Sequence, residues 1–172
     1  MLKRILLLLA FIVLENSLIA QKGTVIVSGI AGATVTLTES SFYKPGLHLM
    51  GLVGYGVNSS KQDAVTAHVG YHSFINKRAT GDVVKMMDIK IGFRFFPSAN
   101  VPVYLHPNVG VGFFADGSGR NASASAGIML GYLPKIGGGN INVFAGFNRI
   151  SFTDGISLFN LGAGYQFKFK RR

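Results

Sequence analysis

The chain of 172 residues contains no cysteine and no tryptophan, and only 7 of its residues are acidic. The absence of cysteine excludes disulfides, thiolate metal sites, a cysteine nucleophile and the lipid-modified cysteine of a lipoprotein. Charged residues make up 14% of the chain, below the roughly 25% of ordinary soluble domains, whereas 48% of the residues are hydrophobic. The formal charge of +10 alone is compatible with nucleic acid or an anionic membrane surface as a partner.

The N-terminal residues are typical of an export signal. Lys3 and Arg4 precede an apolar run from Ile5 to Leu14, and the small residue Ala20 precedes Gln21. The run is shorter than the roughly 20 residues that a membrane-spanning helix needs. We therefore expect residues 1–20 to be a signal peptide cleaved near Ala20 and residues 21–172 to form one mature domain. Export also makes nucleic acid an improbable partner.

Apolar residues recur at every second position after the signal, which is the period of a β-strand with one apolar and one polar face. The clearest stretch, from Ile156 to Phe169, ends the chain except for three basic residues. About eight such segments of roughly 10 to 14 residues follow one another, separated by short polar or glycine-rich connections. The sequence thus predicts an all-β, eight-stranded, antiparallel up-and-down transmembrane β-barrel.

Two segments are irregular. The first predicted strand, Thr24 to Thr38, contains Gly29 and Gly32, which suggest a bulge or a break. Pro107 lies in the middle of another strand and cannot donate a hydrogen bond to a neighbour, so we expect a local bulge there. The last strand is expected to close the barrel against the irregular first strand.

The distribution of polar residues indicates that the apolar face meets lipid. Histidines, asparagines, glycines and the few charged residues share the other face, where they suit a narrow lumen better than a water-exposed surface. Aromatic residues gather toward both ends of the strands, as at the two interfaces of a bilayer. The expected rims contain Tyr55, Phe93, Phe95, Tyr132, Phe167 and Phe169 at one end and Phe113, Phe147 and Phe159 at the other. A secreted soluble barrel with a small apolar ligand is the alternative, and a narrow porin-like pore is a further one.

Four stretches resemble a known family: Ala20–Gln21, Met86 to Pro97, Val103 to Phe114, and Phe159 to Phe169. The mature chain resembles the small OmpA/OmpX-type barrels of Gram-negative outer membranes, and more closely the outer-membrane β-barrel family common in Bacteroidota. The resemblance implies an outer-membrane location in the cell envelope and no catalytic residues. It also implies that the outer-membrane assembly machinery reads a C-terminal aromatic residue, which here is Phe169.

The four histidines all fall on the predicted lumen face. Tight turns would place His48 opposite His72, His72 beside Asp88, His68 beside Lys90, and His106 across from Lys90. A cluster of His48, His72, Asp88 and His106 has the ligand types of a zinc site. We favour the other interpretation, a polar lumen network in which Asp88 pairs with Lys90 and Arg94 and which includes His68. No cofactor and no metal are therefore expected.

The sequence predicts no enzyme, because Ser73 and Ser123 do not flank a histidine and a carboxylate in a catalytic arrangement. Basic residues are expected at the outer rim, where they either contact lipopolysaccharide phosphates or are simply solvated. These residues are Lys44, Lys77, Arg78, Lys85, Arg120 and Arg149. The predicted function is a monomeric outer-membrane barrel with a plugged lumen, in contact with membrane lipid, and with a structural or surface-interaction role.

Overall fold

The structure is a computed structural model that describes residues 23–37, 43–58, 62–77, 83–116, 119–151 and 155–170. Within these ranges the chain forms antiparallel β-strands and their connections. No helix long and apolar enough to cross a membrane occurs in this part of the chain. The predicted signal peptide, residues 1–20, lies outside the described residues.

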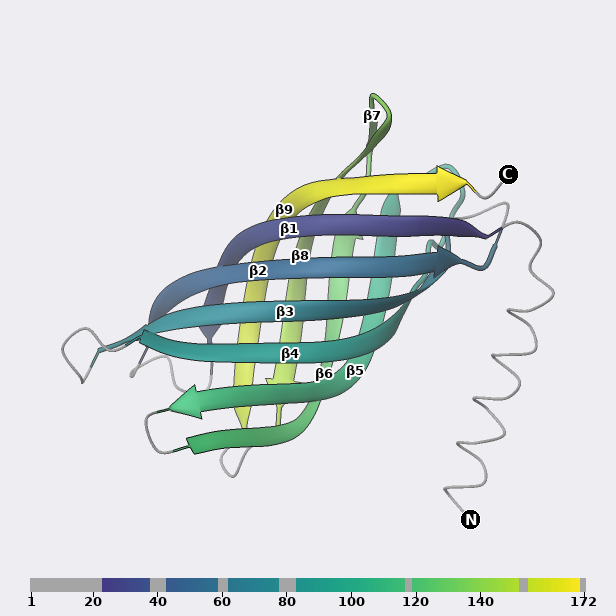
Figure 1. Ribbon diagram of the computed structural model, residues 1–172. Coiled ribbons are helices and arrows are strands. Elements are labelled where there is room, and N and C mark those ends of the chain that lie inside the picture. The colour runs from purple at the N-terminus through teal and green to yellow at the C-terminus, as the bar shows by residue number, and fades with distance from the viewer. Residues whose placement is uncertain are drawn as a thin grey trace, which may run out of the picture.

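Eight long strands form the wall of a barrel, and a two-residue strand extends one of its turns (Figure 1). In chain order the strands are β1 (Thr24–Thr36), β2 (Tyr43–Gly56), β3 (Ala64–Asn76), β4 (Val83–Arg94), β5 (Val103–Asp116), β6 (Gly119–Tyr132), β7 (Lys135–Ile136), β8 (Gly139–Ile150) and β9 (Ile156–Lys170). The short strand β7 pairs with the start of β8 across a tight turn, where Gly137 has a φ of 60°. Residues other than glycine rarely adopt this left-handed conformation.

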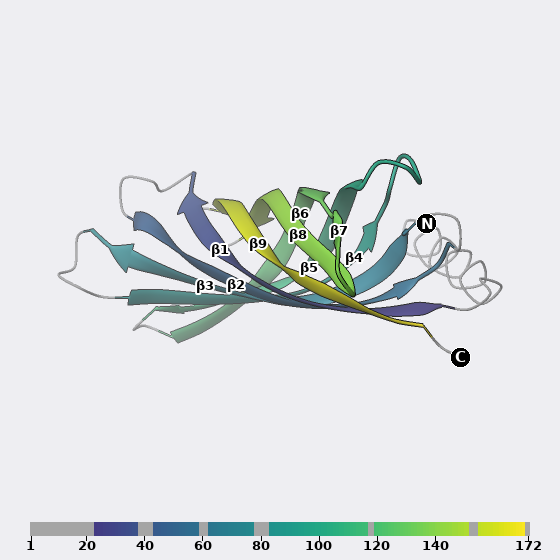
Figure 2. The ribbon, with the colours of Figure 1, turned by 90° about the horizontal axis from the view of Figure 1, so that it is seen from above.

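The wall closes because β9 pairs with β1 and β6 pairs with β8. Starting from Ile26, the partners on successive strands are Gly54, Thr66, Gly92, Asn108, Gly127, Asn148 and Leu158, and the circuit returns to β1 at Thr36, ten residues further along. Such a stagger accompanies strands tilted by about 35–45° from the barrel axis. Figure 2 shows the twist of the strands as the wall curves round. The eight-stranded up-and-down barrel is confirmed.

The first strand is regular, and the predicted bulge or break in it is wrong. Its register runs without a shift against β2 and along the whole of β1 against β9. Gly32 instead allows β1 and β9 to lie close together, because a Cβ there would lie 1.9 Å from the carbonyl oxygen of Leu161. The surroundings of Gly29 are open.

Pro107 causes a gap in pairing rather than a bulge, so the bulge predicted there is also wrong. Toward β6, Pro107 pairs in register with Ile128. Toward β4, pairing stops at Asn108 and resumes in the same register at the bridge between Leu105 and Phe95. The pairing is interrupted on the side where the ring nitrogen of proline has no hydrogen to donate. A register shift does occur beside Pro45, between Lys44 and Leu47 of β2.

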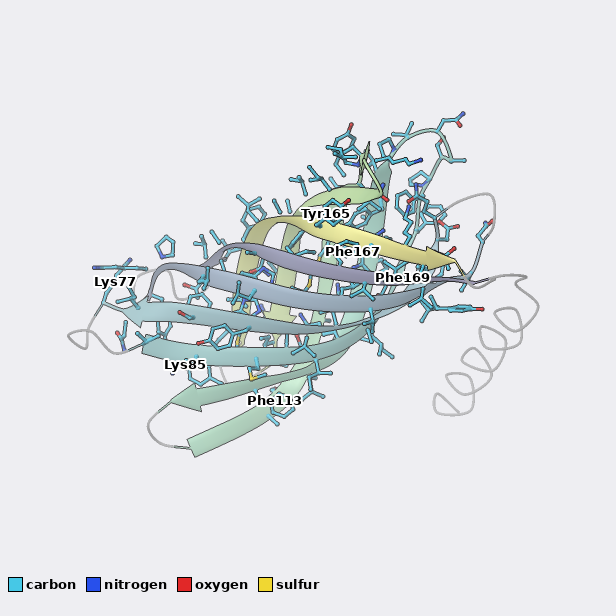
Figure 3. The ribbon with its side chains drawn as sticks, turned by 45° about the horizontal axis from the view of Figure 1, so that its top comes forward. Lys77, Lys85, Phe113, Tyr165, Phe167 and Phe169 are labelled. Carbon is cyan, nitrogen blue, oxygen red and sulfur yellow. The ribbon has the colours of Figure 1, made fainter. Side chains whose placement is uncertain are left out.

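Outward-facing positions form an apolar belt, which we define as the exposed hydrophobic side chains of the eight wall strands. Each wall strand contributes to it, for example Val27, Leu49, Val69, Ile91, Val109, Leu130, Val143 and Leu161 in order round the barrel. All nine predicted rim aromatics are exposed; eight belong to the belt, and Phe95 directly follows β4. Phe167 and Phe169 lie toward one end, and Phe113 lies toward the other (Figure 3). Because the barrel is closed, this belt faces its surroundings on every side.

Inward-facing side chains fill the barrel. The end that holds the start of β1 and the finish of β9, here called the terminal end, contains a buried cluster of Phe96, Tyr104 and Leu133. The opposite end contains Phe74, Met86, Ile150 and Leu158, against which Tyr43, Phe114 and Ile156 pack. Further clusters combine Ile30, Met50, Met129 and Phe144, and Ile26, Leu52 and Ala64. The alternation pattern predicts mainly glycine and polar residues in the lumen, and the structure adds these large apolar side chains to them.

Candidate functional site

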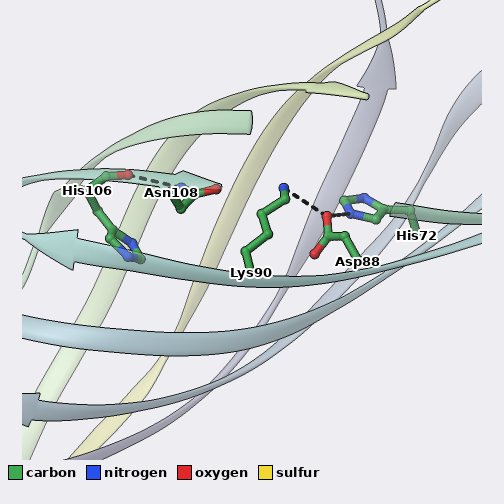
Figure 4. Close-up of polar contacts among 5 residues, drawn as sticks. All are labelled: His72, Asp88, Lys90, His106 and Asn108. Atoms are coloured by element: carbon green, nitrogen blue, oxygen red, sulfur yellow. Dashed lines mark hydrogen bonds and ion pairs between the residues drawn. The ribbon is translucent and has the colours of Figure 1, made fainter. Parts of the chain in front are cut away.

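The main polar cluster of the lumen comes from alternate residues of β2, β3 and β4. His48 and His72 are direct cross-strand partners, and their rings stack with centroids 4.6 Å apart. Asp88 Oδ2 lies 3.2 Å from His72 Nε2 and 3.0 Å from Lys90 Nζ (Figure 4). All four side chains are buried. The lone carboxylate of this cluster therefore lies between an imidazole and an ammonium group, inside the barrel wall.

The remaining histidines form a second group nearer the terminal end. His68 is the cross-strand partner of Lys90, as the turn length predicted. His106 is not across from Lys90, because the partner of Lys90 on β5 is Gly110. The His106 ring instead packs edge-on with the ring of His68, with 5.7 Å between the two ring centroids. Its Nε2 atom lies 2.7 Å from the hydroxyl oxygen of Thr66.

The structure brings together three of the four residues of the predicted zinc cluster, but not the fourth. His48, His72 and Asp88 are neighbours, but His106 belongs to the other group. Among the residues that the structure describes, no three histidine, aspartate or glutamate side chains are placed to hold a metal ion. The lumen is instead a network of buried polar contacts, in which Asp88 and Lys90 are ion-paired.

Arg94 reaches across the lumen rather than toward Asp88. Its Nη1 atom donates to Gln166 Oε1 at 2.5 Å, and its guanidinium carbon lies 4.5 Å from the centre of the Tyr104 ring. The Tyr104 hydroxyl in turn donates to Asn142 Oδ1 at 2.8 Å. We call Arg94, Tyr104, Asn142 and Gln166 the cross-lumen layer. This layer was not predicted from the sequence, although alternation already places all four residues on the inward face of their strands.

A hydroxyl nucleophile needs an adjacent base, so hydroxyl groups beside histidines are the candidates for nucleophilic catalysis. Thr66 and His106 form such a pair, but Thr66 is 2% exposed and His106 is fully buried. Ser123 donates to the carbonyl of Ser151, and Ser73 pairs with Leu47 and Lys85 at outward positions. A substrate in solvent or lipid thus has no direct path to the Thr66–His106 pair.

Solved structures of similar fold are small bacterial surface barrels. The chain is similar to Neisserial surface protein A, NspA, with a TM-score of 0.60 and 17% identity over 86% of this chain and 97% of that one. It is similar to Ail, the attachment invasion locus protein of Yersinia pestis, with a TM-score of 0.56 and 19% identity over 85% and 99%. Ail has also been described as an outer membrane protein in a phospholipid bilayer nanodisc. In fold, this chain is a small eight-stranded β-barrel like these proteins.

A third barrel of this kind, the N-terminal β-barrel domain of Pseudomonas aeruginosa OprF, is similar with a TM-score of 0.51 and 14% identity over 84% of this chain and 97% of that one. No protein-family model and no curated protein matches the sequence. The fold agrees with the bacterial outer-membrane location that the export signal and the apolar belt predict.

The basic residues of the barrel divide into separate groups. Lys44 on β2, Lys77 directly after β3 and Lys85 on β4 lie at the end opposite the terminal end, on three neighbouring strands. Figure 3 shows Lys77 and Lys85 at this end. All three side chains are exposed, and we call them the rim lysines. They present three positive charges on one side of the barrel.

Of the three predicted arginines, Arg149 is the one whose side chain the structure describes, and it does not join this group. Arg149 lies on β8, which β5 and β6 separate from β4, and its Nη1 atom donates to the Ser157 hydroxyl at 3.2 Å. Gly155, with a φ of 62°, leaves room for the Arg149 guanidinium, since a Cβ there would lie 2.8 Å from it. Arg78 and the Arg120 side chain lie outside the described part of the structure.

Proposed function

We propose that this protein is an integral outer-membrane β-barrel with a plugged lumen, whose role is structural or a surface interaction and not catalysis. The observation that carries the proposal is the burial pattern of the closed wall. Large apolar side chains point outward from all eight wall strands, whereas polar and charged side chains are buried inside. Hydrocarbon is the surrounding in which this arrangement is favourable, because between the two ends of the barrel the outward face has almost no polar group to hydrate.

The soluble alternative requires the opposite distribution of polar and apolar side chains. A water-soluble barrel with an apolar ligand needs an apolar cavity and a polar exterior. Here the interior positions carry Asp88, Lys90 and Arg94, and the exterior carries the belt. The deciding experiment is extraction and electrophoresis of the purified protein. We expect a requirement for detergent and a change of gel mobility on boiling, and a protein that stays in water without a heat shift would contradict the proposal.

Tight side-chain packing at two levels supports the plugged lumen. The Phe96 cluster lies at the terminal end, and the Phe74 cluster lies at the other. An eight-stranded barrel has an interior just wide enough for side chains. In planar bilayers we expect no steady conductance from the wild-type protein. A matched variant, Phe74→Ala with Met86→Ala, opens one cluster and serves as a positive comparison. Steady ion-selective current through the wild type would favour the narrow-pore alternative.

The absence of catalysis rests on access rather than on the lack of reactive groups. The Thr66–His106 pair is buried, and among the described residues no carboxylate or other hydrogen-bond partner contacts the His106 Nδ1 atom. A catalytic histidine is normally oriented by such a third group. Substitution Thr66→Val is expected to leave the cellular lipid composition unchanged, as measured by mass spectrometry of extracted membranes. A defined lipid product that depends on Thr66 would contradict this part of the proposal.

The rim lysines support contact with the phosphates of lipopolysaccharide in the outer leaflet. The barrel ends on the same side as it begins, and with the terminal end in the periplasm the rim lysines reach the outer headgroups. A structure of the similar barrel Ail in complex with the heparin analogue sucrose octasulfate shows that a barrel of this fold takes a polyanionic saccharide. Three clustered cations suit such a ligand.

The test compares lipopolysaccharide binding by the folded wild type and by a Lys44→Ala, Lys77→Ala, Lys85→Ala triple variant. Removing the rim lysines is expected to weaken binding at least tenfold and to reduce its dependence on salt. The matched control is Lys135→Ala, because Lys135 is also exposed but lies at the terminal end, on β7. Equal binding by the triple variant and the wild type would show that the rim is merely solvated.

A further inference from the structure

One of the two cations buried in the described part of the lumen has no carboxylate in contact. Lys90 is paired with Asp88 at 3.0 Å. Among the described side chains the other buried carboxylate is Asp63, which accepts hydrogen bonds from the Phe96 amide at 2.7 Å and from the Asn58 side chain at 3.4 Å. Arg94 is 1% exposed, and its contacts are the neutral Gln166 and Tyr104. Arg94 is thus buried without a carboxylate in contact among the described residues, and a buried charge that lacks such a partner is strongly unfavourable.

Hydrogen-bond donors are also in excess around Arg94. Four buried nitrogen groups of the cross-lumen layer have no hydrogen-bond partner: Arg94 Nε, Arg94 Nη2, Asn142 Nδ2 and Gln166 Nε2. The Gln166 amide is oriented by its bond from Arg94, and the Asn142 carbonyl accepts from Tyr104, so both NH₂ groups are left as donors. Each of these four groups is a donor, so each needs a hydrogen-bond acceptor.

The barrel brings these donors together from opposite walls. Arg94 lies on β4 and Gln166 on β9, and three strands separate them in either direction round the barrel. Tyr104 on β5 and Asn142 on β8 complete the layer. Tyr104 also belongs to the Phe96 and Leu133 cluster, which shields the terminal end. The layer is thus a buried group of donors around one guanidinium that contacts no described carboxylate.

We propose that the cross-lumen layer binds one monovalent inorganic anion of the halide class, with chloride as the physiological species. A single negative charge pairs with the single charge of Arg94, whereas a divalent anion would add a second negative charge that no described side chain of the layer offsets. Guanidinium and amide N–H groups are the donors that bind such anions, and burial strengthens the attraction. The proposal concerns the lumen and does not depend on the rim lysines or on lipopolysaccharide binding.

Bromide provides a direct test because it replaces chloride and is visible by anomalous X-ray scattering. The full mature chain is refolded in detergent with sodium bromide, sodium chloride or sodium gluconate at equal ionic strength. We expect a bromide peak within hydrogen-bonding reach of the Arg94 guanidinium and the two amides. The thermal midpoint is expected to rise with halide concentration and to level off, as for binding to one site of the folded state. No peak, together with equal midpoints in all three salts, would show that water alone serves these donors and would overturn the proposal.

Variants separate this site from general salt effects. Arg94→Met removes the charge and most of the donors, so the bromide peak and the halide-dependent shift of the midpoint are both expected to disappear. Lys85→Met removes an exposed cation at the other end of the barrel and is expected to retain both. Should Arg94→Met fail to fold, Gln166→Met keeps the guanidinium and removes one donor, which is expected to raise the half-saturating halide concentration severalfold. An unchanged half-saturating concentration in Gln166→Met would count against the assigned position.

Discussion

A lysine in the middle of the apolar belt provides the sharpest distinction between lipid and water around the barrel. Val109 lies in the middle of β5, faces outward and is 57% exposed. Its cross-strand partners are Ile91 on β4 and Ala126 on β6, which also face outward. Substitution Val109→Lys therefore introduces a charge into the surroundings of the barrel and changes no buried contact of the lumen.

The expected magnitude depends on what surrounds the belt. At the midplane of a bilayer a lysine on the lipid face of a barrel costs about 2–4 kcal/mol, because its ammonium group loses water. This corresponds to a roughly 30- to 700-fold fall in the folding equilibrium constant. On a water-exposed surface the same substitution changes the free energy of unfolding by about 0.5 kcal/mol or less. The two surroundings thus predict clearly separate results.

The assay is a denaturant titration of the protein folded in phospholipid vesicles, with the folded fraction read from gel mobility without boiling. The matched control is Val101→Lys, because Val101 is 49% exposed but precedes β5 at the terminal end, where the interface is near. We expect a cost of about 1 kcal/mol or less for the control. Equal and small costs at Val109 and Val101 would refute the argument that the belt faces hydrocarbon.

Three further predictions concern the interior and use the same titration. Gly110→Ala places a Cβ 2.0 Å from the Ile89 carbonyl oxygen and is expected to destabilise the fold by about 1–3 kcal/mol. The control Gly29→Ala meets no atom within 4 Å and is expected to be nearly neutral. Equal effects would contradict the close strand contact at Gly110. Asp88→Asn leaves the buried Lys90 ammonium group without its carboxylate and is expected to cost about 3–5 kcal/mol, most of which a second substitution, Lys90→Met, recovers. A double variant as unstable as the single one would show that the ion pair is not the cause. Phe144→Ala leaves a cavity in the central apolar cluster and is expected to cost about 3–5 kcal/mol, and a cost below 1 kcal/mol would mean that the lumen is not tightly packed there.

The local pattern of the sequence was sufficient for the strands and for part of the lumen. Alternation depends only on neighbouring residues, so the outward and inward sets could be separated before any contact was known. Short turns also determine hairpin register. For this reason the pairing of His48 with His72 and of His68 with Lys90 was predicted correctly. The register of β4 and β5 follows a longer connection, and the predicted place of His106 was wrong.

The sequence by itself therefore determined the period, the faces and the number of the strands, because each follows from residues close together along the chain. Only the tertiary structure decided what meets inside the barrel. Arg94 and Gln166 are 72 positions apart and touch because the staggered wall closes and brings β4 and β9 to opposite sides of one narrow lumen. The stagger of a closed barrel is a property of all its strands together. No single hairpin shows it, and the cross-lumen layer with its unpaired guanidinium appears only with closure.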